Sequence, residues 1–472
     1  MATEIAWVRD VNVRKRTIAR EVLLLSVKNN RLLVLNEQAR AIWDMFTNTE
    51  ALRERDIIEA LDKEYPDATI EQLSTDVHNF FCDLQRKGFV RRDGEATPKT
   101  EVNGNEKTVL SGHLSFSERL HQRATQCNIP VSGGLELTQR CHLRCIHCYI
   151  DNQPISCANE LSTTEVFTLL DQMAECGCLW LLITGGEPLL RRDFSDIYCH
   201  AKKLGMIVTI FTSAANLTPR VADVLAEYPP FLVEATLHGS TETTFDGVTG
   251  VQGSFRQFQY GIGLLRELGI PFHLKMIVMR KNLHEVELAR QLAIKLGAGD
   301  FRFDPLVNAD FLHSTKAVDS RITVEEAIKL DLLEPYQDRL EKAYRKAFEE
   351  QAQKSVSRDL LFPCRAGKCS FTVSADDKLL PCVLMRVPAY DLRTMSFSEA
   401  WRALNRYTTT VRMQEDNHCR TCLVQTCSRC PAWGYLEYED PNAKSRFACA
   451  LQQEREARFL STNRQKEANH EC

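Results

Sequence analysis

From residue 131 onward, short apolar runs alternate along the chain with longer segments in which apolar residues recur at helical spacing. Six of the runs have the length of strands: residues 135–137, 179–184, 207–212, 231–237, 272–279 and 301–304. Between the first two runs, Ser162 and Glu165 form a capping-box pattern ahead of an amphipathic segment. This alternation predicts an α/β fold with a parallel sheet and crossover helices, whose ligands bind at the carboxyl ends of the strands.

Residues 1–93 have a different pattern, which predicts a small α+β domain. Two apolar runs within residues 22–35 flank a polar turn and predict a β-hairpin. Three helical segments follow. Asn36 can cap the first of them, and Thr69 with Gln72 forms a capping box for the third. A short apolar pair then predicts a final strand. Strands, three helices and a final strand together predict a winged-helix domain.

The rest of the chain divides by composition. Turn-forming and polar residues predict a linker with one short helix, charged helical segments predict a connector between domains, and a cysteine-rich region is followed by a charged tail. The predicted boundaries are a linker over 94–130, the main sheet over 131–318, the connector over 319–360, the cysteine-rich domain over 361–453 and the tail over 454–472.

Composition narrows the class of protein. A chain of 472 residues is long enough for several domains, and its formal charge of −4 argues against a general nucleic-acid binder. No apolar run approaches the length of a membrane span, and the N-terminus lacks the apolar core of a secretory signal, so we expect a cytoplasmic protein. Eighteen cysteines in such a protein indicate thiolate-held metal rather than disulfides.

Three cysteines, Cys141, Cys145 and Cys148, lie close together directly after the first predicted strand. Three thiolates suit a metal centre that keeps one coordination position open, since a closed structural zinc site takes four ligands. A [4Fe-4S] cluster also takes four thiolates as a rule, so a run of three leaves one iron for a small molecule. The alternatives are a fortuitous group of cysteines or part of a zinc site.

The motif Cys141-x3-Cys145-x2-Cys148, followed by Tyr149, resembles the cluster loop of the radical S-adenosylmethionine (SAM) enzymes. The resemblance implies a partial six-stranded β/α barrel in which the open iron binds the amino and carboxylate groups of SAM. One electron from the cluster then splits SAM into methionine and a 5′-deoxyadenosyl radical, which takes a hydrogen atom from the substrate. Residues 185–188, Gly-Gly-Glu-Pro, match the SAM-binding turn of this family at the end of the second predicted strand.

Further SAM contacts are implied by position in the same family. Ser213 stands where Asn-Gly often follows the third strand, and His238 stands where Asp is common after the fourth. His238 either faces ribose or substrate or is a solvated turn residue, and the sequence leaves both open. His147 occupies the position whose backbone meets the adenine. No catalytic acid or base can be named. The expected cofactor contacts are His147, Gly185, Gly186, Glu187, Pro188, Ser213, Thr236 and His238.

A second field of eight cysteines lies near the C-terminus, enough for two fully ligated [4Fe-4S] clusters or two zinc sites. Its order resembles the SPASM extension of peptide-modifying radical SAM enzymes, which implies three [4Fe-4S] clusters in all, one binding SAM and two auxiliary. Two spacings are shorter than usual, and Asp377 stands where Gly is common. By position, the resemblance assigns Cys364, Cys369, Cys382 and Cys430 to one auxiliary cluster, and Cys419, Cys422, Cys427 and Cys449 to the other.

The pattern from Leu32 through Val90 resembles the PqqD-like peptide-recognition domain, typified by the small peptide chaperone of pyrroloquinoline quinone biosynthesis. In that family a leader peptide adds as a strand to the sheet edge and packs against the third helix. The alternatives are a DNA-binding winged helix and a purely structural cap. Acidic residues at the outward positions of the third predicted helix (Glu71, Asp76 and Asp83) argue against DNA binding, because a helix that faces phosphates should be basic.

Together the resemblances imply a radical SAM/SPASM maturase that oxidatively cross-links a ribosomally made peptide, with a thioether expected first and a carbon–carbon bond second. The auxiliary clusters would accept the surplus electron or ligate a substrate thiolate. Expected partners are a precursor peptide or small protein bound through its leader, and a reductant such as flavodoxin or ferredoxin; neither nucleic acid nor membrane is expected. The alternatives are a sulfatase-maturase-like oxidase of a protein residue, a tetrapyrrole-modifying enzyme and, outside this class, a zinc-containing winged-helix regulator.

Overall fold

The computed structural model describes residues 5–46, 51–95, 108–150, 160–353 and 359–468. Parts of the predicted N-terminal domain, linker, main sheet, connector and tail lie outside the described residues. In the described part of the chain, none of the helices combines the length and the apolar character needed to cross a membrane.

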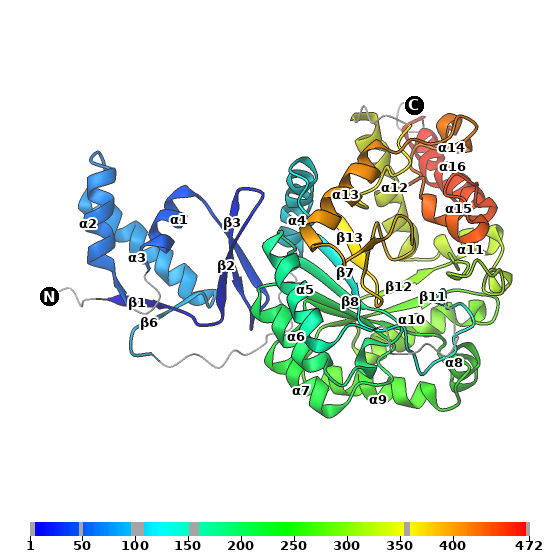
Figure 1. Ribbon diagram of the computed structural model, residues 1–472, viewed down its shortest axis with the longest axis horizontal. Coiled ribbons are helices and arrows are strands. Elements are labelled where there is room, and N and C mark those ends of the chain that lie inside the picture. Colours follow the sequence, from blue (N-terminus) through cyan, green and yellow to red (C-terminus); the bar gives the residue numbers. More distant parts are fainter. Residues whose placement is uncertain (1–4, 47–50, 96–107, 151–159, 354–358, 469–472) are drawn as a thin grey trace.

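The six apolar runs of the central region form six adjacent parallel strands, which confirms the α/β prediction (Figure 1). Side chains such as Ile183, Val208 and Leu274 are fully buried, because helices cover the sheet. The strands are β7 (Ser132–Glu136), β8 (Trp180–Thr184), β9 (Ile207–Thr212), β10 (Leu232–Thr236), β11 (Phe272–Ile277) and β12 (Phe301–Asp304).

Helices connect successive strands, as the parallel arrangement requires. Ser162 and Glu165 form the predicted capping box at the start of the first of them, and Gly297 ends the last in a left-handed conformation. The helices are α5 (Thr163–Glu175), α6 (Phe194–Lys203), α7 (Pro219–Glu227), α8 (Glu242–Thr249), α9 (Ser254–Glu267) and α10 (Val286–Leu296), with short 3-10 turns η2 (Pro188–Leu190) and η3 (Leu283–Glu285).

The cysteine-rich region extends the central sheet, which the sequence did not predict. Strand β13 (Ser370–Val373) pairs in parallel with β7, and β14 (Lys378–Leu380) and β15 (Tyr390–Asp391) follow in antiparallel order. Pairing between strands more than 200 positions apart leaves no signal in a local hydrophobic pattern. The sheet therefore joins β7, the first of the six parallel strands, to the cysteine-rich region.

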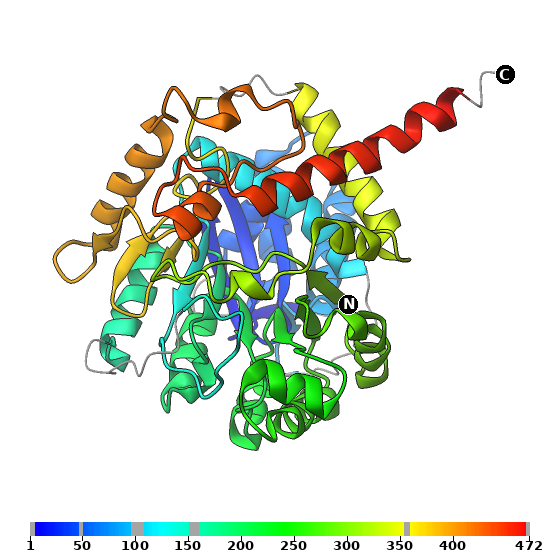
Figure 2. The same cartoon turned by 90° about the vertical axis from the view of Figure 1, so that its right-hand side faces the viewer.

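Most of the regular structure that follows the central parallel strands is helical (Figure 2). The predicted connector is helical as expected, and the predicted loose tail is largely helical too. Phe459 is buried, and Asp331 accepts two hydrogen bonds from Arg455 (2.7 and 3.0 Å), which fixes the last helix to the connector. The elements are η4 (Val318–Ser320), α11 (Val324–Asp331), α12 (Tyr336–Gln353), α13 (Phe397–Thr410), α14 (His418–Thr421), α15 (Pro431–Tyr438) and α16 (Arg446–Ala468).

The N-terminal region contains the predicted hairpin and three helices. The Asn36 cap and the capping box of Thr69 with Gln72 are present as predicted. Strands β1, β2 and β5 were not predicted, because their sequences are short or highly charged. The elements are β1 (Ala6–Arg9), β2 (Val13–Ile18), β3 (Glu21–Ser26), β4 (Arg31–Leu35), α1 (Glu37–Asp44), β5 (Leu52–Arg53), α2 (Glu54–Glu64), α3 (Ile70–Arg86) and β6 (Val90–Arg92), in two sheets ordered β2-β3-β4 and β5-β1-β6.

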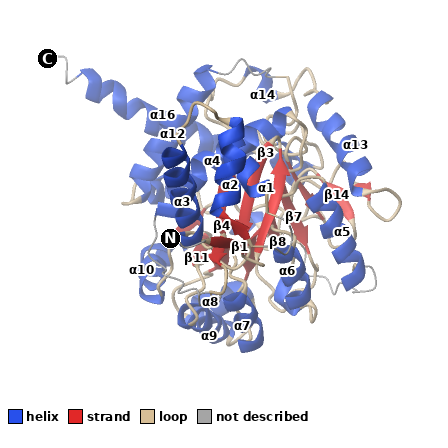
Figure 3. Cartoon of the chain, turned by 90° about the vertical axis from the view of Figure 1, so that its left-hand side faces the viewer, coloured by secondary structure: helices blue, strands red, loops and turns tan. Residues whose placement is uncertain are grey.

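The β2-β3-β4 sheet packs against the amino ends of the central strands (Figure 3). Leu23 and Leu25 share a buried cluster with Leu179 and Ile207, which lie at the starts of β8 and β9. Helix α4 (Thr108–Gln126) completes this cluster, so the predicted linker contains a helix longer than the short one expected. The N-terminal domain is therefore attached to the end of the sheet opposite the carboxyl ends of its strands.

Arg16 explains why a charged strand lies at this interface. Its guanidinium donates to the carbonyl oxygens of Ala174 (2.8 Å), Cys178 (3.0 Å) and Leu204 (3.2 Å) of the barrel region. A second polar contact comes from the β3–β4 turn, where the Asn30 amide donates to the Pro229 carbonyl oxygen (2.8 Å). Three paired N–H groups satisfy the partly buried charge, so a run of basic residues can form an interface strand.

We predict that Arg16→Ala weakens this attachment by about 2 kcal/mol, because hydrogen bonds from a charged donor are lost at a desolvated site. Chemical denaturation of the full-length protein measures the change. Arg55→Ala is the matched control: Arg55 is paired with Glu59 on the exposed face of α2, and its loss should change stability by less than 1 kcal/mol. Equal effects of the two substitutions would contradict the role given to Arg16.

Candidate active site

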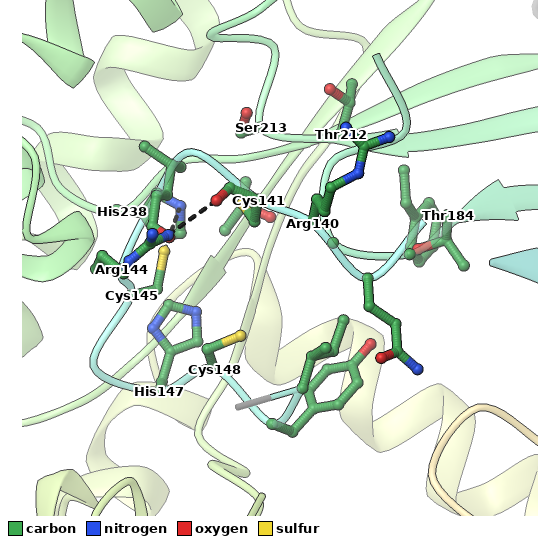
Figure 4. Close-up of a pocket in the computed structure, with 18 residues that line it drawn as sticks. Arg140, Cys141, Arg144, Cys145, His147, Cys148, Thr184, Thr212, Ser213 and His238 are labelled. Atoms are coloured by element: carbon green, nitrogen blue, oxygen red, sulfur yellow. Dashed lines mark hydrogen bonds between the residues drawn. The ribbon is translucent and has the colours of Figure 1, made fainter. Parts of the chain in front are cut away.

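The loop that follows β7 carries Cys141, Cys145 and Cys148 to the carboxyl ends of the parallel strands, where they line a cavity of ≈ 420 Å³ (Figure 4). Strand ends contribute the opposite wall. Of the predicted cofactor contacts, His147, Gly185, Gly186, Ser213, Thr236 and His238 line this cavity, whereas Glu187 and Pro188 do not. The structure thus brings together residues from four β/α units, at the edge where the strand order predicted a ligand.

Several lining residues were not predicted. Arg140 comes directly before Cys141, and Arg144 comes directly before Cys145. Their position next to the thiols was the sequence signal that could have identified them as lining residues. Thr184 and Thr212 are the last residues of β8 and β9, and only the parallel register places them at the cavity.

Glu187 lies behind the residues that line the cavity and supports them. Its side chain is fully buried and accepts hydrogen bonds from the Thr212 hydroxyl (2.7 Å) and from the backbone amide of Ser213 (2.8 Å). It also accepts from the Leu189 amide in η2. These bonds join the turn after β8 to the end of β9 and fix Ser213 at the cavity.

The turn formed by Gly185 and Gly186 lies directly on the cysteine loop. The amide of Gly186 donates to the Thr138 carbonyl oxygen (2.7 Å), and the amide of Glu187 donates to that of Arg140 (2.8 Å). A Cβ atom on Gly185 would lie 2.2 Å from the Thr138 oxygen, and one on Gly186 would lie 2.3 Å from the Arg140 oxygen. Only glycine allows this backbone contact, and the positive φ of Gly185 (133°) also favours glycine.

His238 is buried and His147 is half-buried beside the cysteines, and their ring centroids lie 5.3 Å apart. Burial, together with the charge of Lys275, lowers the pKa of His147 to about 4, and burial lowers the pKa of His238 well below its usual range. Within the described structure, neither Nδ1 atom has a hydrogen-bond partner. His238 is only 4 % exposed, which excludes the solvated turn residue that the sequence left open.

The thiols fit an iron–sulfur cluster. Burial raises the pKa of Cys141 to about 12 and that of Cys145 well above its usual range, so these groups are thiols until metal binding displaces their protons into solvent. Among the described residues, no three His, Cys, Asp or Glu side chains are placed around a single ion. A cluster requires no such arrangement, because each thiolate binds a different iron. Three thiols around one cavity therefore suit a cluster with one open iron better than a zinc ion.

Several of the C-terminal cysteines lie close enough together to shift one another's pKa. After burial, the charges of Cys382 and Cys364 are the main causes that raise the pKa of Cys430, and Cys364 also raises the pKa of Cys369. The pKa of Cys449 is raised to about 11 by burial and by its neighbours Cys419, Cys427 and Cys422. Each thiol thus interacts with members of its own predicted set.

A buried ion pair that was not predicted lies between the cavity and the first of these sets. Glu136, the last residue of β7, is 2 % exposed and accepts two hydrogen bonds from Arg386 (2.9 and 3.1 Å). The guanidinium carbon of Arg386 lies 3.7 Å from the centre of the Phe311 ring, which in turn packs edge-on against Tyr149. This group connects the residue after Cys148 to the segment after Cys382.

Two family profiles match the chain: the Radical SAM superfamily over residues 135–293, and Coenzyme PQQ synthesis protein D (PqqD) over residues 21–90. The chain is a radical SAM enzyme with an N-terminal PqqD-like domain. Enzymes of this class use a [4Fe-4S] cluster and SAM. The resemblance drawn from the three-cysteine motif and from Gly185-Gly186 is thereby confirmed at the level of the family.

Curated relatives include the AdoMet-dependent heme synthase of Methanosarcina barkeri, 27 % identical over 66 % of this radical SAM chain and 94 % of its own length. The PqqA peptide cyclase of Bradyrhizobium diazoefficiens is 28 % identical over 74 % of this chain and 94 % of its own. Among solved structures, Streptococcus suis SuiB bound to its precursor peptide SuiA has a TM-score of 0.55 at 14 % identity, covering 94 % of this chain and 99 % of SuiB. That likeness shows a shared fold.

We predict that Gly186→Ala destabilises the protein by roughly 2 to 3 kcal/mol, because the new methyl group would meet the carbonyl oxygen of Arg140 and force the cysteine loop to move. Denaturant-induced unfolding under anaerobic conditions measures this loss. The control is Gly263→Ala in α9, where a Cβ atom meets nothing within 4 Å. This substitution should stabilise by about 0.5 to 1 kcal/mol, since alanine is the better helix former. A neutral Gly186→Ala would show that the turn does not constrain the loop.

Proposed function

We propose that this radical SAM enzyme oxidatively cross-links a ribosomally made peptide that it holds through a leader segment. One combination carries the proposal: a PqqD-like domain over residues 21–90 and a three-cysteine cavity lie in the same chain. The PqqA peptide cyclases and SuiB with its precursor peptide support a peptide substrate. The cross-link is proposed to be a thioether first and a carbon–carbon bond second.

In this proposal Cys141, Cys145 and Cys148 hold the SAM-binding cluster. The residues proposed to contact SAM are those that line the cavity, His147, Gly185, Gly186, Ser213, Thr236 and His238, while Glu187 and Pro188, which do not line it, complete the turn. When bound, the cluster and SAM supply one-electron reduction and a 5′-deoxyadenosyl radical. The protein's part is to position the reacting groups and to exclude water. Glu187 fixes Ser213, and the glycine turn holds the cysteine loop against β8.

We further propose that the two C-terminal sets of four thiols hold two auxiliary [4Fe-4S] clusters. The support is the grouping of their electrostatic neighbours and the partial burial of Cys382 and Cys430. Glu136 and Arg386 would keep the first set at a fixed position beside the cavity, because their buried ion pair connects β7 to the segment that follows Cys382. Flavodoxin or ferredoxin is the proposed source of electrons.

Strand β4 is the proposed docking edge for the leader. It pairs with β3 on one side, and in the described structure no other strand is paired to its second side. An added peptide strand would receive main-chain hydrogen bonds there. The Arg31 guanidinium donates to the Arg86 carbonyl oxygen (2.9 Å), so the start of β4 lies beside the end of α3. The leader would therefore contact both the strand and the third helix.

Modification of a tetrapyrrole is the second candidate, because heme synthases are among the relatives. A tetrapyrrole substrate would leave the PqqD-like domain without a role. A peptide substrate would give a role both to that domain and to the three-cysteine cavity. Incubation with iron-coproporphyrin, SAM and reductant would separate the two functions. A porphyrin product without any peptide product would favour this second candidate.

We predict that Cys145→Ala abolishes formation of 5′-deoxyadenosine, because two thiolates cannot retain a cluster that leaves one iron open to SAM. The measurement is chromatography after anaerobic incubation of reconstituted protein with SAM and dithionite. Cys127→Ala is the control, since Cys127 is exposed beyond the end of α4 and should give the wild-type yield. A wild-type yield from Cys145→Ala would contradict the proposed ligand set.

We predict that co-expression with short reading frames encoded beside this chain yields a peptide that is two hydrogen atoms lighter. Mass spectrometry with and without thiol alkylation distinguishes the bonds, because a thioether consumes a cysteine thiol and a carbon–carbon bond does not. The Cys145→Ala protein is the negative control. If every neighbouring peptide keeps its mass while deoxyadenosine is formed, the peptide part of the proposal is wrong and the radical part is not.

A further inference from the structure

The loop after β10, which carries His238, is fixed by two buried side chains. Asn282 is fully buried, and its amide donates to the His238 carbonyl oxygen (3.0 Å) and to that of Ile277 (3.0 Å). Glu285 is 3 % exposed and accepts from the backbone amide of Ser240 (2.6 Å) and the hydroxyl of Thr241 (2.8 Å). These bonds fasten the loop to the start of α10, so the position of His238 is set independently of any bound molecule.

The fixed loop places the His238 ring against the cysteine loop, as Figure 4 shows. Its Nε2 atom lies 3.9 Å from the Sγ atom of Cys145. The ring of Phe245 packs edge-on against the imidazole at 5.1 Å and closes its other side. A hydrogen bond to sulfur is long, so this separation is within the range for an N–H donor and a thiolate acceptor.

We propose that His238 is a positioning residue for Cys145. The Nε2–H group of His238 donates to the Cys145 sulfur and raises the reduction potential of the cluster that this cysteine holds. This inference rests on the proposed function. A ligating thiolate can only accept, so the proton of this contact lies on Nε2. Donation to a ligating sulfur withdraws electron density and favours the reduced cluster, which carries the extra negative charge.

The surroundings strengthen such a bond. The cavity wall around His238 is buried, and a hydrogen bond is electrostatically stronger in a medium of low dielectric constant than in water.

The test is an EPR-monitored redox titration of reconstituted full-length protein. The relevant cluster is recognised as the one whose signal changes on adding SAM. His238→Phe retains the ring and removes the donor, and we expect its midpoint potential to shift to a more negative value. His238→Gln can present an N–H group at the reach of Nε2, and should restore most of the shift. His147→Phe is the control: it removes the other imidazole of the same cavity, which is less buried than His238, and its shift should be much smaller.

An unchanged potential in His238→Phe, or equal shifts in the Phe and Gln variants, would overturn the inference. Weaker SAM binding with an unchanged potential would also overturn it and assign His238 to the cofactor. If no signal of the wild-type protein responds to SAM, the proposed function fails as well, so the two failures are distinct.

A measurement on the unmutated protein is independent of how the variants fold. Protein labelled with ¹⁵N-histidine should show a nitrogen coupling to the SAM-responsive reduced cluster in pulsed EPR, transmitted through the sulfur of Cys145. Absence of that coupling in the wild-type protein would overturn the inference.

Discussion

The site depends on one backbone-to-backbone contact. The Gly185-Gly186 turn after β8 lies so close to residues 138–140 that neither glycine can carry a side chain, and two amides of the turn donate to carbonyl oxygens of the cysteine loop. This contact joins the loop after β7 to the end of the next strand. Glu187 then joins the same turn to the end of β9. A loop that carries three thiols is thereby held by paired main-chain groups rather than by the metal alone.

The local pattern predicted much of this fold. The spacing of apolar residues and the capping residues predicted the six central strands and their helices, because each element buries its own apolar face. The charged strand β2 was missed, since its Arg16 is satisfied only by carbonyl oxygens of the barrel region. The pairing of β13 with β7 was missed as well, because a register between distant strands has no local signal.

The candidate site divides in the same way. The spacing of Cys141, Cys145 and Cys148 and the Gly-Gly-Glu-Pro turn led to the cavity, because both motifs are continuous in sequence. Thr184, Thr212 and the Glu136–Arg386 pair could not be predicted, since their position depends on how separate strands come together. The burial of His238 likewise follows from the clamp formed by Asn282 and Glu285, which lie more than forty residues further along the chain.

The attachment of the N-terminal domain sets a distance for any peptide held at β4. That strand lies against the amino ends of the central strands, and the cavity lies at their carboxyl ends, so the length of the strands separates the two. A strand of six residues such as β9 spans roughly 20 Å. A substrate anchored at one pole must travel along the outside of the molecule to the other. Under the proposed docking, such a tether would leave the distal part of the peptide free to present several residues in turn, so a single docking event would allow successive reactions.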